Sequence, residues 1–219
     1  MLRSLCVLAI PALAITISAP AHANHKVTES FKINSQGANA SFFGADNCSA
    51  VSVAIFYSAT MSRVNNTNNT PFPTTFVEID YQNICTGDAF FMNGTTDQQQ
   101  ATIRGDIGAA TLSAQVPVST LDGSVRTTVT VSLSWKATGA LNVFKEKVMS
   151  NGGGVRFKQV TDNTNRPAEA TGTVAAMLPL TTPTGVRNTF TNLVFGPSVD
   201  AIIAKNLFGQ VTVTRTFPN

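Results

Sequence analysis

Two carboxylates that stand two positions apart are the best candidates in this sequence for acid–base or metal chemistry. Glu78 and Asp80 alternate with Val77, Ile79 and Tyr81. If this segment is a strand, both carboxylates share one face of a sheet, about 6.5–7 Å apart along the backbone. That spacing suits a glycosidase acid–base pair or a calcium site completed by a loop oxygen. The alternation has a second interpretation, in which the apolar residues face the core of a one-sided sheet and both carboxylates face solvent.

Other catalytic and cofactor-binding patterns are missing from the sequence. Beyond the N-terminal segment discussed below, the one histidine is His25, which lies beside an expected chain end, where a Ser-His-Asp triad or a metal–histidine site is not expected. The sequence has no P-loop and no dinucleotide-binding glycine pattern. Gly152-Gly153-Gly154 lies between two expected strands and is interpreted as a turn. We therefore expect no catalytic residues, no metal and no cofactor, and a protein that is not an enzyme.

A dense group of cations lies in residues 141–161, on both sides of that glycine turn. Folding the segment about Gly152-Gly153 puts four cations on one face of a hairpin, with Lys147 opposite Lys158. The other face is apolar and can pack on the core. The four cations are Lys145, Lys147, Arg156 and Lys158, and the apolar residues are Phe144, Val148 and Phe157.

Three explanations fit this cationic face. Lysines protect an exposed edge strand from pairing with another chain, or carboxylates from elsewhere in the fold neutralise the cluster. The third explanation is a docking face for an anionic partner, such as an acidic glycan, a lipopolysaccharide phosphate or another cell-surface component. Directly opposed like charges destabilise a strand pair, and a cluster retained despite that repulsion makes the docking explanation worth testing.

The overall charge is too small to indicate nucleic acid as a partner. The chain has 15 Lys and Arg against 12 Asp and Glu, and removal of a segment containing Arg3 leaves 14 against 12, or +2. Domains that bind nucleic acid carry a strong basic excess. Only 12% of the residues are charged, while Thr, Ser, Asn, Val and Ala dominate, and β-branched residues favour strands over helices.

The N-terminus has the layout of a signal peptide. Arg3 precedes an apolar run from Leu5 to Ile17, and Ala21-His22-Ala23 matches the small-x-small pattern of a signal peptidase site. The apolar run is shorter than the ~20 residues of a membrane span, and no later run approaches that length. We therefore expect a signal peptide at residues 1–23 that directs bacterial export, and a secreted or periplasmic protein that does not span a membrane.

Two cysteines remain in the expected mature chain, Cys48 and Cys85. An exported chain meets an oxidant, so these two residues are expected to form one disulfide. A strict pairing of Cys48 with Cys85 sets Val53 opposite Asp80, an apolar residue against a charge. We therefore expect either a β-bulge that restores the apolar match or two strands that lie in facing sheets.

The strongest secondary-structure signal is a hairpin. Residues 112–118 and 125–135 alternate apolar and polar on either side of a polar turn that contains an Asp-Gly pair. Folding at this turn puts both apolar sets on one face. Trp135 then falls across from Gly108 or Ala110, small residues that leave room for an indole.

Shorter alternating runs on both sides of this hairpin complete the expected fold. Residues 141–149 are open between a helix and a strand, and the glycine turn that follows favours a strand. About ten to twelve strands separated by turn signals predict an all-β protein, either an antiparallel β-sandwich or a jelly-roll-like fold. No linker divides the chain, so residues 24–219 are expected to form a single domain.

Parts of the sequence resemble an uncharacterised family of secreted bacterial β-rich proteins. The similar segments are 129–139 (VTVSLSWKATG) and 168–174 (AEATGTV), and Cys85-Thr86-Gly87 is similar to a C-T-G triplet that the family tends to carry. The resemblance implies a secreted β-rich fold. It implies no activity, ligand or cofactor.

These observations favour an exported, non-enzymatic protein with a binding or structural role. The leading ligand class is an anionic surface or glycan. One alternative is a glycan-active or calcium-dependent carbohydrate-binding module that uses Glu78 and Asp80. Another is a protein-interaction or surface-display domain that presents the Asn/Thr-rich loop from Asn65 to Phe72.

Overall fold

The computed structural model describes residues 26–45, 47–65, 67–182, 185–195 and 197–216. The predicted signal peptide at residues 1–23 and His25 lie outside these described residues. The described residues fold as an all-β protein with twelve antiparallel strands in one hydrogen-bonded sheet, which confirms the predicted class and number of strands. The strands are β1 (Lys26–Ala45), β2 (Ser49–Val64), β3 (Thr67–Asn68), β4 (Phe72–Asn83), β5 (Ala89–Thr96), β6 (Gln99–Ile103), β7 (Ala109–Thr120), β8 (Arg126–Ala137), β9 (Asn142–Gly152), β10 (Val155–Thr182), β11 (Gly185–Phe195) and β12 (Asp200–Thr216).

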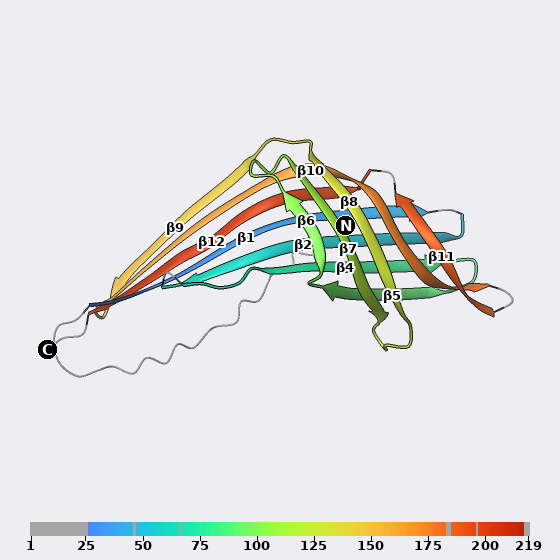
Figure 1. The fold of residues 1–219 in the computed structure, drawn as a ribbon, viewed down its shortest axis with the longest axis horizontal. Helices are drawn as coiled ribbons and strands as arrows, with labels where there is room; N and C mark the ends of the chain where they lie inside the picture. Colours follow the sequence, from blue (N-terminus) through green and yellow to red (C-terminus); the bar gives the residue numbers. More distant parts are fainter. Residues whose placement is uncertain (1–25, 46, 66, 183–184, 196, 217–219) are drawn as a thin grey trace.

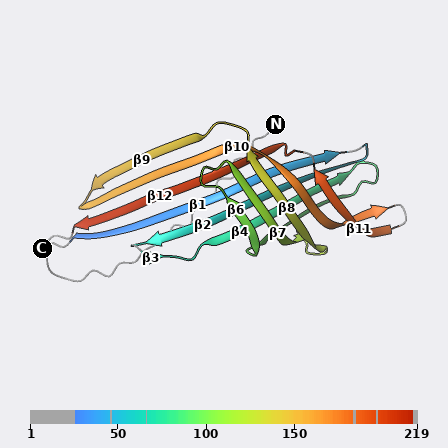
Figure 2. The same ribbon diagram turned by 45° about the horizontal axis from the view of Figure 1, so that its top comes forward.

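The sheet closes on itself and forms two facing layers. Its main path runs β1-β12-β10-β8-β7-β5-β4-β2, and β2 pairs again with β1. Figure 1 and Figure 2 show β7 and β8 crossing obliquely over β1, β2 and β4. The core lies between these layers, because alternate residues of each strand point inward. Its largest fully buried side chains include Trp135, Phe42, Ile55, Ile79 and Met92.

The hairpin of β7 and β8 has one of the two predicted registers. Ala110 lies directly opposite Trp135, as expected for an indole that needs a small partner. The buried indole Nε1 donates a hydrogen bond of 2.7 Å to the backbone oxygen of Asn39 in β1. Since β8 and β1 belong to opposite layers, this bond joins the layers through the core.

The turn between β7 and β8 is organised by one carboxylate. The hydroxyl of Thr120 donates to Asp122 Oδ1 at 2.5 Å, and Ser124 donates to the same oxygen through its hydroxyl at 2.8 Å and its amide at 3.1 Å. These bonds stabilise the charged form, with the Thr120 hydroxyl contributing most, and hold the pKa of Asp122 at about 2.

One end of the sheet extends beyond the crossing strands β5 to β8, on the left in Figure 1. We call this extension the arm. It contains five hydrogen-bonded strand segments, with register shifts at Lys32/Ile33 and Val160/Asp162, and none of the crossing strands lies in front of it in either view. The segments are all of β9 and residues 155–165 of β10, 204–215 of β12, 26–37 of β1 and 58–64 of β2.

The hairpin of β9 and β10 forms the outer edge of the arm. Residues 142–152 form a strand, as the following glycines favoured. Val155 pairs with Gly152, so the two turn residues are Gly153 and Gly154, both with positive φ (55° and 76°). Two successive residues with positive φ suit a two-residue turn whose twist matches the flanking strands, and glycine adopts this conformation without a Cβ clash.

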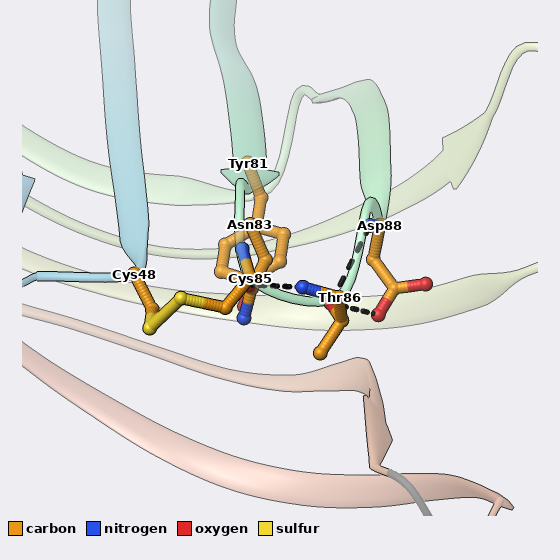
Figure 3. The surroundings of a disulfide bond; sticks show 6 residues. All are labelled: Cys48, Tyr81, Asn83, Cys85, Thr86 and Asp88. Atoms are coloured by element: carbon orange, nitrogen blue, oxygen red, sulfur yellow. Dashed lines mark hydrogen bonds between the residues drawn. A yellow bond between two sulfur atoms is a disulfide. The ribbon is translucent and has the colours of Figure 1, made fainter.

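The disulfide closes the end of the β2–β4 pair, as predicted (Figure 3). Neither the bulge nor the facing sheets expected from its spacing occurs, because the bridge lies just beyond the paired residues. Ser49 pairs with Asn83, the Cα atoms of the cysteines are 5.2 Å apart, and Val53 lies opposite Ile79. The Asn83 side chain accepts hydrogen bonds from the amides of Cys85 and Thr86 and fixes the turn that carries the second cysteine.

Among the described residues, no helix is long and apolar enough to cross a membrane.

Candidate functional site

The two faces of the arm follow from the register. Ala38, Tyr57 and Ile203 lie side by side in neighbouring strands, and all three point into the core. Residues two positions apart share a face, so counting outward from this row defines an inner face, continuous with the core side, and an outer face. In β12 the pairing with β1 skips Gly209, and beyond it the even-numbered residues belong to the inner face.

The inner face carries nearly all the cations of the arm. The four predicted cations lie together on it, two in β9 and two in β10. The structure adds four that the sequence analysis missed, because their strands join β9 and β10 only through long-range pairing. The predicted set is Lys145, Lys147, Arg156 and Lys158, and the added set is Lys26, Lys32, Arg63 and Lys205.

The predicted pairing within the hairpin was wrong by two positions. Lys147 lies opposite Val160, and Lys158 lies opposite Met149, because the turn is centred one residue later than expected. A shift of two positions keeps every side chain on its face, so the four cations still share one face. They are therefore interleaved with apolar residues rather than opposed to one another.

A direct like-charge pair occurs elsewhere on the inner face. Lys32 of β1 lies opposite Arg63 of β2. Like charges in this arrangement destabilise a strand pair. The row of paired residues that contains Lys32 and Arg63 continues through β12 and β10 to Lys147 in β9, at the far edge of the arm. Three cations therefore lie at one level across the sheet.

Little within the described residues neutralises this charge. Lys145 forms an ion pair with Asp162 at 3.3 Å, and its side chain remains 70% exposed. Lys205 Nζ donates to the backbone oxygen of Gly105 at 2.8 Å, a bond that leaves its charge in place. In the described segments, no other cation of the inner face has a carboxylate within 4.0 Å. Neutralisation by the fold, one of the explanations considered above, therefore accounts for one cation.

A hollow of about 480 Å³ lies at the tip of the arm, beside the glycine turn. Lys26 and Arg156 line it together with Thr214. The Thr214 hydroxyl is within hydrogen-bonding distance (3.2 Å) of Thr28. Two cations and a hydroxyl at one depression give a place where a single anionic group could be held by charge and by hydrogen bonds.

The predicted carboxylate pair lies in β4, outside the arm. Val77 and Ile79 are fully buried, and Glu78 and Asp80 occupy the opposite face, with Asp80 exposed. Opposite Asp80 in the neighbouring strands stand Ser52 and Phe91 rather than further acids. The described residues contain no group of three or more His, Cys, Asp or Glu placed to hold a metal ion. Glu78 and Asp80 therefore lie on the face of β4 away from the core, which is the second of the two interpretations of this segment.

The loop from Asn65 to Phe72 contains the short strand β3, which pairs with the end of β2. Phe72, at the start of β4, is 72% exposed. Among its described residues, which exclude residue 66, Phe72 lines an open hollow of about 1130 Å³ that also includes Asp97, and Pro71 lines one of about 410 Å³ that also includes Lys205.

The chain matches no known protein family, no curated protein and no solved structure. The inner face of the arm is therefore the candidate functional site on its geometry and charge alone.

Proposed function

We propose that this protein is an exported, non-enzymatic binding protein, and that the inner face of its arm binds an acidic polysaccharide. The observation that carries the proposal is the convergence of eight cations from five strands on one face of a protein in which only 12% of residues are charged. Disulfide formation and the signal-peptide pattern both support export.

The layout of the cations favours a polymer over a small anion. Neighbouring strands are about 4.8 Å apart, and residues on one face of a strand recur about every 6.6 Å. The cations thus form a grid across an open face about five strands wide, with Thr and Ser hydroxyls between them at positions such as Thr212 and Ser30. An extended chain with a carboxylate on each sugar can meet several of these cations at once, and the hydroxyls can bond to its sugar oxygens.

The composition of the inner face favours a glycan over a lipid surface. The described aromatic side chains of the arm, Phe31, Phe144 and Phe157, all lie on the outer face. Proteins that dock on lipid bilayers combine cations with apolar or aromatic side chains that enter the headgroup boundary. The inner face of the arm supplies charge and hydroxyl groups together with the exposed side chains of Met61, Val143 and Met149, and it has no aromatic residue among its described side chains.

The test uses two triple variants that remove the same charge. In the first, Lys147, Arg156 and Lys158 are replaced by Gln. In the second, the exposed cations of the crossing strands and their loops are replaced by Gln, namely Arg104, Arg126 and Lys136. The first variant should lose retention on immobilised alginate, a linear polyuronate, at physiological ionic strength, and the second should keep most of it, because exposed charges then act over a Debye length of only about 8 Å.

Equal loss in both triple variants would show that net charge, rather than the inner face, determines retention, and would contradict the proposal. Retention of the wild type on immobilised dextran, which is neutral, would contradict it as well. Strong binding to anionic phospholipid vesicles without binding to alginate would assign the face to a lipid surface instead.

A further inference from the structure

The outer face of the arm carries many apolar side chains, although no described strand covers it. Across one level of the sheet, Phe31 lies beside Val64 and Val211, and the row continues through Gln159 to Val148 at the edge. The apolar face of the β9–β10 hairpin was expected to pack on the core, and the structure shows that this expectation was wrong. Phe144 is 58% exposed and Val148 is 41% exposed. The apolar residues of this face are Val27, Phe31, Ile33, Val64, Phe144, Val148, Val155, Phe157, Val211 and Val213.

The size of this face matches that of an interface. The four strands β1, β12, β10 and β9 at about 4.8 Å each span about 19 Å, and the nine residues from 27 to 35 at about 3.3 Å each span about 30 Å, which gives about 570 Å². Polar side chains such as Glu29, Glu146 and Gln159 lie among the apolar ones on this area. Two such faces in contact would bury about 1,100 Å², above the ~1,000 Å² that distinguishes a specific interface from a chance contact.

We infer that two copies of this chain associate face to face through the outer faces of their arms. Two sheets pack with their apolar faces about 10 Å apart, which fits a face that is open and formed by one sheet. A twofold arrangement uses the same patch on both copies and closes after two subunits. Charges of both signs lie on this face, Glu29 and Glu146 against Arg215, so each copy offers the other an opposite charge.

The arrangement has a functional consequence that rests on the proposed polysaccharide binding. When the outer faces are in contact, the two inner faces point away from each other. A dimer would then hold two separate polysaccharide chains and cross-link them, whereas a monomer would only bind one.

Adjacent residues of β9 give matched variants for the test. Val148 (41% exposed) faces outward and Met149 (43% exposed) faces inward, and Phe144 (58%) and Val143 (52%) form a second such pair. The exported, oxidised protein and the variants Val148→Glu and Met149→Glu are compared by sedimentation velocity over a concentration series. Wild type and Met149→Glu should be dimers, and Val148→Glu should be a monomer with an unchanged melting temperature.

Four outcomes would overturn the inference. They are a monomeric wild type at all concentrations, two dimeric variants, two monomeric variants (which would indicate pairing along the β9 edge), and a dimeric Phe144→Glu. If Val148→Glu fails to fold, Phe144→Glu against Val143→Glu decides the question. Agglutination of alginate-coated beads separates the two proposals: Val148→Glu should bind the beads without agglutinating them. A wild-type dimer that does not bind alginate would refute the polysaccharide proposal alone.

Discussion

Replacement of Trp135 by Phe tests whether the two layers are joined through the core as described. The change removes the indole N–H that donates to the Asn39 backbone oxygen at 2.7 Å, and it leaves a smaller ring in a site that is 2% exposed. Loss of the hydrogen bond contributes about 1 kcal/mol, and the partial cavity contributes about 1 kcal/mol more. We expect the free energy of unfolding to fall by about 2 kcal/mol in total.

For a chain of this size, a loss of about 2 kcal/mol corresponds to a fall of about 4–8 °C in melting temperature. The melting temperature is measured by far-ultraviolet circular dichroism with the disulfide intact, because the variant lacks the protein's one tryptophan and so its fluorescence. The control is Lys136→Ala, the next residue of β8, whose side chain is exposed. If Trp135→Phe melts within 1 °C of the control, the indole neither fills the core nor bonds across it.

Two further predictions concern the β7–β8 turn and the disulfide. Asp122→Asn should lower the melting temperature at pH 7, and the difference from wild type should disappear near pH 2. A depressed pKa of about 2 gives a stabilisation that is present above about pH 4 and is lost as the pH falls through the folded value. A difference in melting temperature that persists at pH 2 would refute a role for the charge. Reduction of the Cys48–Cys85 bond should destabilise the protein by about 4 kcal/mol in the chain-entropy model. Thiol labelling of the denatured, unreduced protein should find neither cysteine free, and labelling at both positions would contradict the bridge.

Local patterns in the sequence were sufficient to predict the fold class, the approximate number of strands and the two hairpins β7–β8 and β9–β10. The alternation in β7 and β8 left two registers, both of which put a small residue opposite Trp135, because a short hairpin allows few registers that keep both apolar sets on one side. The β9–β10 register was missed by two positions, because three successive glycines allow the turn to be centred at more than one place. Which face of this hairpin holds the cations was still predicted, because a two-residue shift preserves the face.

Long-range pairing accounts for what the sequence did not reveal. Lys32 and Arg63 join the cationic face through the pairing of β1 with β2 and β12, and no local pattern connects these residues with Lys147. The expectation that Phe144 packs on the core failed for the same reason. Alternation shows that a strand has an apolar face, but only the tertiary arrangement shows that this part of the sheet extends beyond the layer that would cover it.

The central claim is that the inner face of the arm binds an acidic polysaccharide, and lysine footprinting tests it most directly. The exported protein is acetylated briefly with and without alginate at low salt, and modification of each lysine is measured by mass spectrometry. Lys32, Lys147 and Lys158 should be protected by alginate, Lys136 on β8 should be modified equally in both samples, and high salt should remove the protection because it screens the charges. Modification of Lys32, Lys147 and Lys158 that is the same with and without alginate would contradict the account.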